Sequence, residues 1–147
     1  MAYKFSKKSI ERLKGVNSLL INILLDGIKE SPYDFGIPRD GGFRTLQRQK
    51  ELYAKGRTTE KLRSKGIEDI EGKPNASKIT WTLNSYHITG NAFDIYAYVN
   101  GKASWSMKYL EPIARHLQTV ALKEFDTDLE WGQDLWGKDG AHFQIKK

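Results

Sequence analysis

The chain has 147 residues, with 24 Lys or Arg against 18 Asp or Glu, so its formal net charge at pH 7 is +6. This length suits one domain, because two halves would each be too small to bury a sufficient core. Cysteine is absent, which excludes disulfides, thiolate zinc sites and cysteine nucleophiles. No apolar run reaches the ~20 residues of a membrane helix, and no secretory signal is recognisable, so stable membrane insertion is not expected. The positive charge favours an anionic partner: nucleic acid, a membrane surface or an anionic cell-wall polymer.

The N-terminal segment is expected to be one long helix. Apolar residues recur at steps of three and four from Ile10 to Ile28, which is the spacing of one helix face. Ser6 is a suitable N-cap, and the helix should stop before Pro32, because a residue that precedes proline avoids the helical region. The prediction is a packing helix over residues 6–30.

A strand and a second helix are expected to follow. Residues 33–37 have the composition of a short strand, and Thr45 is placed to cap a helix over residues 46–55 that ends at Gly56. Residues 57–78 are charged and show little periodicity, which predicts a long surface loop with one helical turn.

The second half of the chain is expected to be richer in strands. Residues 79–83 and 92–99 alternate in the manner of strands, and Asn100-Gly101 is a strong hairpin signal. A helix capped by Ser106 and running to Phe125 should come next. It should be followed by two short strands, at residues 129–131 and 142–145. Helices that lead and strands that follow predict an α+β fold rather than alternating βαβ units.

Two of the three histidines lie in segments that suggest chemistry. His87 lies seven residues before Asp94, with Gly90 between them to allow a sharp turn, whereas His116 is expected on a helix without neighbouring ligand-type residues. Two histidines and one carboxylate form a complete protein ligand set for catalytic zinc. His142 would complete that set from a strand paired beside Asp94. Spacing alone leaves ordinary structural roles open for all three residues.

A candidate general base precedes the last histidine. Asp139 lies three residues before His142, where an Asp-Gly turn can direct its carboxylate toward the open side of a metal. An ordinary Asp-Gly turn without catalytic function is the alternative. Glu130 and Asp134 are the rival carboxylates for the same role.

Five blocks of the sequence together resemble a known family. They are Ser-Tyr-His-Ile-Thr-Gly-Asn-Ala-Phe-Asp at 85–94, Asp-Gly-Ala-His at 139–142, Gly-Phe-Arg-Thr at 42–45, Gln-Lys-Glu-Leu-Tyr at 49–53 and Gly-Arg-Thr at 56–58. This combination is similar to the zinc D-alanyl-D-alanine metallopeptidase group. The group includes VanY-type carboxypeptidases and the L-alanyl-D-glutamate endopeptidases that phages use as endolysins.

The resemblance is greatest to the phage endolysin branch. Residues 31–35, 87–90 and 98–102 look like that branch, and so does Asp139, where the carboxypeptidases tend to carry Glu. An endolysin of this type is made in the host cytoplasm without a signal peptide, is released by a separate holin, and then acts in the peptidoglycan layer.

The resemblance implies a role for each matching residue. His87, Asp94 and His142 would bind Zn²⁺, and Asp139 would be the base. Arg44 resembles the arginine that polarises the scissile carbonyl, and a fixed guanidinium suits the charge that develops there.

The resemblance also implies a fold, a substrate contact surface and a partner. The expected fold is Hedgehog/D-Ala-D-Ala-peptidase-like, with a small antiparallel sheet packed against helices. Residues 1–147 would form a single zinc peptidase domain, a monomer without a separate wall-binding domain, acting on bacterial peptidoglycan. Ser85 and Trp131 are the candidate substrate contacts, and Trp136 is a second tryptophan that could wall the cleft. For Trp131 and Trp136, core packing is the more common alternative.

Two other functions compete with an L-alanyl-D-glutamate endopeptidase. A carboxypeptidase of the same group would remove only a terminal D-Ala from the stem peptide. A basic nucleic-acid-binding protein is suggested by the charge, with lysine and arginine at residues 7–8, 12–14 and 146–147. These charges are scattered and accompany no recognised nucleic-acid motif, so no nucleic-acid partner is expected.

Overall fold

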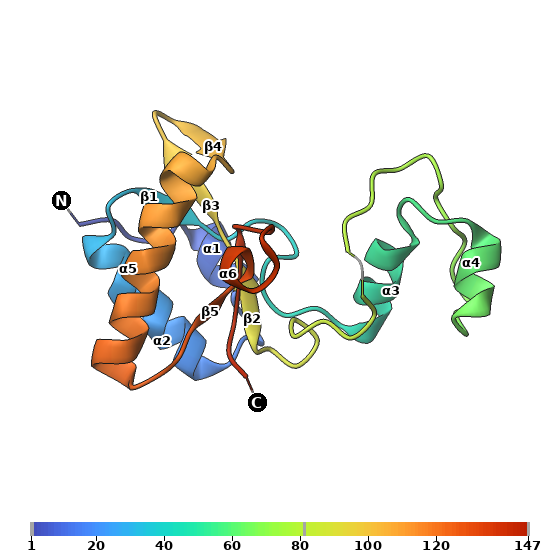
Figure 1. Ribbon diagram of the computed structural model, residues 1–147, viewed down its shortest axis with the longest axis horizontal. Coiled ribbons are helices and arrows are strands. Elements are labelled where there is room, and N and C mark those ends of the chain that lie inside the picture. The colour runs from blue at the N-terminus through green and yellow to red at the C-terminus, as the bar shows by residue number, and fades with distance from the viewer. Residues whose placement is uncertain (1, 81, 147) are drawn as a thin grey trace.

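The computed structural model describes residues 2–80 and 82–146. A main body contains most helices and all strands, and an arm with two short helices extends from it (Figure 1). The helical elements are α1 (Lys7–Arg12), α2 (Ser18–Gly27), the 3-10 turn η1 (Ile28–Glu30), α3 (Leu46–Ala54), α4 (Thr59–Ser64), α5 (Met107–Phe125) and α6 (Gly132–Trp136). The strands are β1 (Asp34–Gly36), β2 (Ala92–Asp94), β3 (Tyr96–Val99), β4 (Lys102–Ser104), β5 (Glu130–Trp131) and β6 (His142–Gln144). In the described part of the chain, no helix has the length and apolar character needed to cross a membrane.

The strands form two small antiparallel sheets, with orders β1-β3-β4 and β2-β6-β5. The predicted α+β class is therefore confirmed, with two sheets where one was expected. The strand predicted over residues 92–99 divides at the fully buried Ile95, whose N–H donates to the Ala141 carbonyl. The chain passes there from one sheet into the other, so β2 pairs with β6 while β3 pairs with β1.

The prediction of one continuous helix over residues 6–30 is wrong, because the chain forms two separate helices, α1 and α2, in this segment. Ser6 caps α1 as expected, by accepting from the Ser9 N–H at 3.2 Å. The helix then breaks at Gly15, which has a left-handed φ of 88°, and Asn17 caps α2. The break has a tertiary cause, because the Asn17 N–H after it donates to the Gly90 carbonyl at 2.8 Å.

The core lies between α2, α5 and the two sheets. Helix α5 buries one stripe of side chains, as its predicted spacing requires, and α2 packs along it. The largest fully buried side chains of this core are Trp131, Phe93, Phe143, Leu13, Leu20, Ile23, Leu24, Ile28, Ile37 and Ile95. Each buried side chain of this kind contributes about 1.5–3 kcal/mol relative to exposure. This core fixes the sheet on which the candidate site lies.

The arm has a second, smaller core. Thr45 caps α3 by accepting from the Arg48 N–H at 3.0 Å, which confirms the predicted helix start. The predicted loop over residues 57–78 contains α4 as its helical turn. Four buried residues hold the arm together: Tyr53, Ala54, Leu62 and Ile67.

One predicted strand is absent, the short helix α6 was not predicted, and several other elements of the second half are confirmed. Residues 79–80 and 82–83 form no strand, and Trp81 lies outside the described residues. The Asn100-Gly101 hairpin joins β3 to β4, with both residues at positive φ. Ser106 caps α5, and the last two strands form where they were expected.

Candidate metal centre

The sheet β2-β6-β5 has one apolar face and one polar face. Phe93, Phe143 and Trp131 are direct cross-strand neighbours and are buried in the core, with the Phe93 and Phe143 rings stacked 5.1 Å apart. Because side chains alternate along a strand, the flanking positions point to the opposite face. That face carries Asp94 and His142, which are also a register pair.

His87 comes from a turn that only a glycine permits. Gly90 has a φ of 77°, and a Cβ there would come within 2.5 Å of the Gly15 carbonyl oxygen. The turn is supported by Ser85, whose Oγ accepts from the His87 N–H at 3.1 Å. The imidazole is buried and its Nδ1–H donates to the Gly42 carbonyl at 2.7 Å. The sharp turn predicted at Gly90, between His87 and Asp94, is therefore present.

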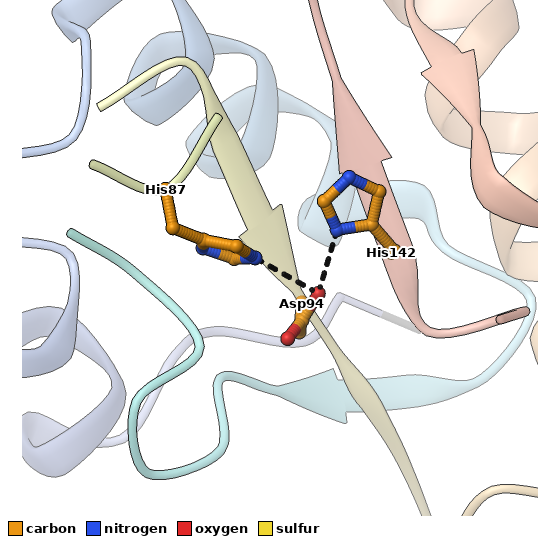
Figure 2. A group of neighbouring side chains, drawn as sticks. All are labelled: His87, Asp94 and His142. Carbon is orange, nitrogen blue, oxygen red and sulfur yellow. Dashed lines mark hydrogen bonds and ion pairs between the residues drawn. The ribbon is translucent and has the colours of Figure 1, made fainter. Parts of the chain in front are cut away.

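His87, Asp94 and His142 form one cluster, with both imidazoles beside the Asp94 carboxylate (Figure 2). Asp94 Oδ1 lies 3.4 Å from His87 Nε2 and 3.1 Å from His142 Nδ1, and all candidate ligand atoms lie within 4.8 Å of one another. Two ligands bound tetrahedrally at ~2.0–2.1 Å are about 3.3–3.4 Å apart, so the spacing fits zinc-sized coordination. Among the described residues, these three side chains form a group that could hold a metal ion, and they are the ones that the family resemblance implied.

Hydrogen bonds leave one nitrogen of each imidazole available. His87 Nδ1 is hydrogen-bonded to the Gly42 carbonyl, and His142 Nε2 is hydrogen-bonded to Gln144 Oε1 at 2.8 Å. A carbonyl oxygen only accepts, so these nitrogens carry the protons. His87 Nε2 and His142 Nδ1, the two nitrogens nearest to Asp94, are therefore the ones that would bind a metal, which is how metal-ligating histidines are normally oriented. A bound metal would take the place of the proton through which His142 Nδ1 donates to the Asp94 carboxylate.

The electrostatics favour a charged carboxylate at the centre. Burial by itself would raise the pKa of Asp94, but the two neighbouring imidazoles bring that pKa well below its ordinary value. For His142, burial opposes the charged form, but the hydrogen bond to Asp94 and the Asp94 charge, together with Gln144 and the Asp139 charge, outweigh burial and raise the pKa. Arg44 Nη2 lies 3.4 Å from Asp94 Oδ2, on the side of the carboxylate away from the histidines.

The cluster opens into a cavity of about 800 Å³. Its walls include His87, Asp94 and His142 together with Arg44, Ser85, Asp139, Trp136, Tyr86, Lys138, Gln144, Asn84, Thr80, Thr82 and Ile79. Arg44, Ser85 and Asp139 are thus brought to one cavity from three separate segments. Local desolvation and the Asp94 charge raise the pKa of Asp139 above its ordinary value.

Both rival carboxylates lie outside the cavity lining. Asp134 is exposed and forms a two-point ion pair with Arg115 at 2.7 and 3.0 Å. Glu130 accepts from Gln144 Nε2 at 3.1 Å. Of the three candidate bases, Asp139 is the one in the cavity.

Trp131 was expected to contact the substrate, but it does not line the cavity. Its side chain is 1% exposed, and its indole N–H donates to the Gly140 carbonyl at 2.7 Å. The prediction that it walls the cleft is therefore corrected: Trp131 belongs to the core. Trp136 lines the cavity instead, with its ring 5.3 Å from that of His142.

Two glutamines support the site and were not predicted. Gln49 is fully buried, accepts from Arg44 Nη1 at 3.2 Å and donates to the Thr82 carbonyl at 2.7 Å. Gln144 is the partner of His142. The period of two along a strand was a signal for Gln144, because residues 142 and 144 share a face.

A His–Asp–His cluster at the wall of a cavity, on an α+β fold, defines a candidate metal-dependent hydrolase. The family profile described as phage L-alanyl-D-glutamate peptidase matches residues 1–74 and 68–147, and the chain belongs to this family. It is an L-alanyl-D-glutamate endopeptidase, as the sequence motifs predicted.

Two similar proteins agree with this assignment. The L-alanyl-D-glutamate peptidase of Escherichia phage T5 is 30% identical over 147 residues, which cover 100% of this chain and 92% of that protein. The crystal structure of the Serratia marcescens L-Ala D-Glu endopeptidase ChiX aligns with a TM-score of 0.72 and 28% identity. That alignment covers 99% of this chain and 91% of the other. The fold class is therefore confirmed by a solved structure.

Proposed function

We propose that this endopeptidase is a zinc enzyme that lyses bacterial cell walls by cutting the L-alanyl-D-glutamate bond of peptidoglycan stem peptides. The convergence of His87, Asp94 and His142 on one wall of the cavity is the observation that carries this proposal. Two imidazoles and one carboxylate are borderline in softness and leave a coordination position open, which suits zinc. When bound, the metal supplies Lewis-acid polarisation of the scissile carbonyl and lowers the pKa of a water.

Asp139 is the proposed general base and acid. Its carboxylate faces the same cavity as the cluster, and its raised pKa brings it closer to the range in which a carboxyl group both takes and returns a proton. Asp139 takes a proton from the attacking water at a carboxylate oxygen. It then passes that proton to the departing amide nitrogen.

Arg44 is the proposed electrophilic residue and Ser85 the proposed substrate contact. The Arg44 guanidinium is 9% exposed and held in place, because Nε donates to the Asp40 carbonyl at 2.8 Å and Nη1 to Gln49. A fixed charge of this kind stabilises a developing oxyanion without reorganisation. Ser85 lies at the wall of the cavity, and its hydroxyl is proposed to hydrogen-bond the backbone of a bound peptide.

The chain is further proposed to work as a single monomeric domain. Its net charge of +6 favours encounter with an anionic wall polymer. In this proposal the enzyme is made in the host cytoplasm and acts once it reaches the peptidoglycan layer.

Mass spectrometry of digested peptidoglycan tests the bond and the metal together. Purified protein should release stem fragments that begin with D-glutamate. Chelation should stop the release and zinc should restore it. His142→Ala should remain inactive at the same zinc concentration, and metal analysis of the purified protein should find zinc. Loss of only a terminal D-alanine would assign carboxypeptidase activity instead, and undiminished digestion by metal-free protein would end the zinc proposal.

A further inference from the structure

A short chain of hydrogen bonds leads away from the candidate metal cluster, on the polar face of the sheet β2-β6-β5. His142 Nε2 is 2.8 Å from Gln144 Oε1, and Gln144 Nε2 is 3.1 Å from Glu130 Oε1. Gln144 and Glu130 are directly opposite each other in the β5–β6 pair. The Gln144 side chain is 8% exposed and that of Glu130 is 12% exposed, so water competes little for these bonds.

The chemistry of the three groups gives this chain one direction. An ionised carboxylate only accepts, so Glu130 requires the NH₂ end of the Gln144 amide. The amide oxygen must then face His142, and because that oxygen only accepts, His142 Nε2 must carry the proton. Asp94 Oδ1 also only accepts and lies 3.1 Å from His142 Nδ1, so in the neutral ring Gln144 and Asp94 compete for the proton. The Gln144–Glu130 pair favours the proton on Nε2, which leaves the Nδ1 lone pair for a metal.

We propose that Glu130 and Gln144 are positioning residues that set the His142 tautomer and thereby the affinity for the metal. Glu130 acts through Gln144 and not on the substrate, since it is absent from the cavity lining. This inference rests on the proposed metal centre. It gives a function to the Glu130 carboxylate, which the sequence indicated only as a rival to Asp139 for the role of base.

A purely structural role for the pair would have a different signature. Both residues join β5 to β6, and a structural contact would affect the free energy of unfolding without selecting a tautomer. The decisive measurements are therefore the zinc affinity of the folded protein and the protonated nitrogen of His142. The first is obtained by competition with a chelator. The second is obtained from long-range ¹H–¹⁵N NMR of metal-free protein at alkaline pH.

The first test removes each member of the chain in turn. Gln144→Met keeps the side-chain length but accepts no proton from His142, and Glu130→Met leaves the Gln144 amide free to rotate. Both variants should bind zinc ~10–100-fold more weakly, which is the usual cost of losing such a partner. His142 should shift from the Nε2–H form toward the Nδ1–H form, in which the ring donates to Asp94. Asp134→Asn is the matched control, because it removes a carboxylate of α6 that pairs with Arg115, and it should change neither quantity.

The second test exchanges the two side chains. In the double variant Glu130→Gln/Gln144→Glu, a carboxylate still accepts from His142 and an amide still donates to it. Zinc affinity and the Nε2–H tautomer should therefore be retained. A folded Gln144→Met protein with unchanged zinc affinity would overturn the inference, and so would an exchanged pair that fails to hold the tautomer. If His142→Ala binds zinc normally, the proposed metal centre itself has been assigned wrongly, and not only the role of Glu130 and Gln144.

Discussion

The two sheets have the same number of strands, and each contains one pair of strands that are distant in the chain, but two of the three candidate metal ligands lie on one of them. In β1-β3-β4, strands β3 and β4 are joined by a two-residue turn at Asn100 and Gly101. In β2-β6-β5, Asp94 and His142 are 48 residues apart in the chain and meet only through strand pairing. The other sheet also contains a distant pair, since β1 pairs with β3 and Asp34 lies opposite Tyr98, but Asp94 and His142 lie on the β2–β6 pair. A slip of one residue in that pairing would turn His142 from the cavity into the core, so the register itself specifies the site.

The largest loss of activity is expected beside the sheet β2-β6-β5, at Asp139. Asp139→Asn keeps the size and polarity of the side chain but cannot take a proton, so turnover should fall ~10²–10⁴-fold. Zinc affinity and the free energy of unfolding should be unchanged, and peptidoglycan digestion measures the rate. Asp134→Asn is the control and should digest normally. If Asp139→Asn loses zinc, Asp139 is a ligand and the coordination has been assigned wrongly.

Arg44 should give the next largest effect. Arg44→Ala removes one stabilising group from the oxyanion, which typically costs ~2.7–4 kcal/mol of barrier. Arg44→Lys keeps the charge but loses the planar fork that holds the Asp40 carbonyl and Gln49, so it should also be slow. Kinetics with zinc-saturated protein separates this loss from metal binding. A normal rate for Arg44→Ala would remove Arg44 from the mechanism.

The hairpin of the other sheet should affect stability alone. Gly101 has a φ of 75°, and nothing lies within 4 Å of a Cβ built there. Gly101→Ala therefore costs only the left-handed conformation, about 1–2 kcal/mol of unfolding free energy. Zinc affinity and kcat should not change, which would show that a loss of stability in the β3–β4 hairpin leaves the site on the other sheet intact. Gly66→Ala in the arm is a matched variant, with a φ of 81° and equally open space, and denaturant unfolding should give a similar loss.

The smallest effect is expected in the loop between β1 and α3. Arg48 donates to both carboxylate oxygens of Asp40, at 2.8 and 3.1 Å, and lowers the pKa of Asp40. Because the folded pKa is below the unfolded value of ~3.9, this pair stabilises the protein above that pH. Its contribution, at most about 1 kcal/mol for a partly exposed pair, is lost as the pH falls through the folded pKa. Denaturant unfolding from pH 7 to pH 3 should show a shallower decline for Asp40→Asn, and an unchanged slope would contradict this assignment.

Local signals in the sequence were sufficient for many elements. The caps at Ser6, Thr45 and Ser106 and the turn at residues 100–101 act within a few residues, so no distant contact has to be known. The family resemblance also implied the candidate metal ligands, which spacing alone left open and which the structure brings into one cluster. The family motifs then indicated the endopeptidase activity that the comparisons bear out.

Other features depended on contacts between distant segments. The apolar spacing of residues 10–28 continues through Gly15, but the chain breaks there because Asn17 must reach the Gly90 carbonyl. Burial decided which of two tryptophans lines the cavity, since Trp131 and Trp136 are alike in the sequence. The chain of hydrogen bonds from Glu130 through Gln144 to His142 could be recognised only once the β5–β6 register was known. Short-range signals fix local conformation, whereas side-chain partners depend on which strands pair, and that pairing is decided by the whole core at once.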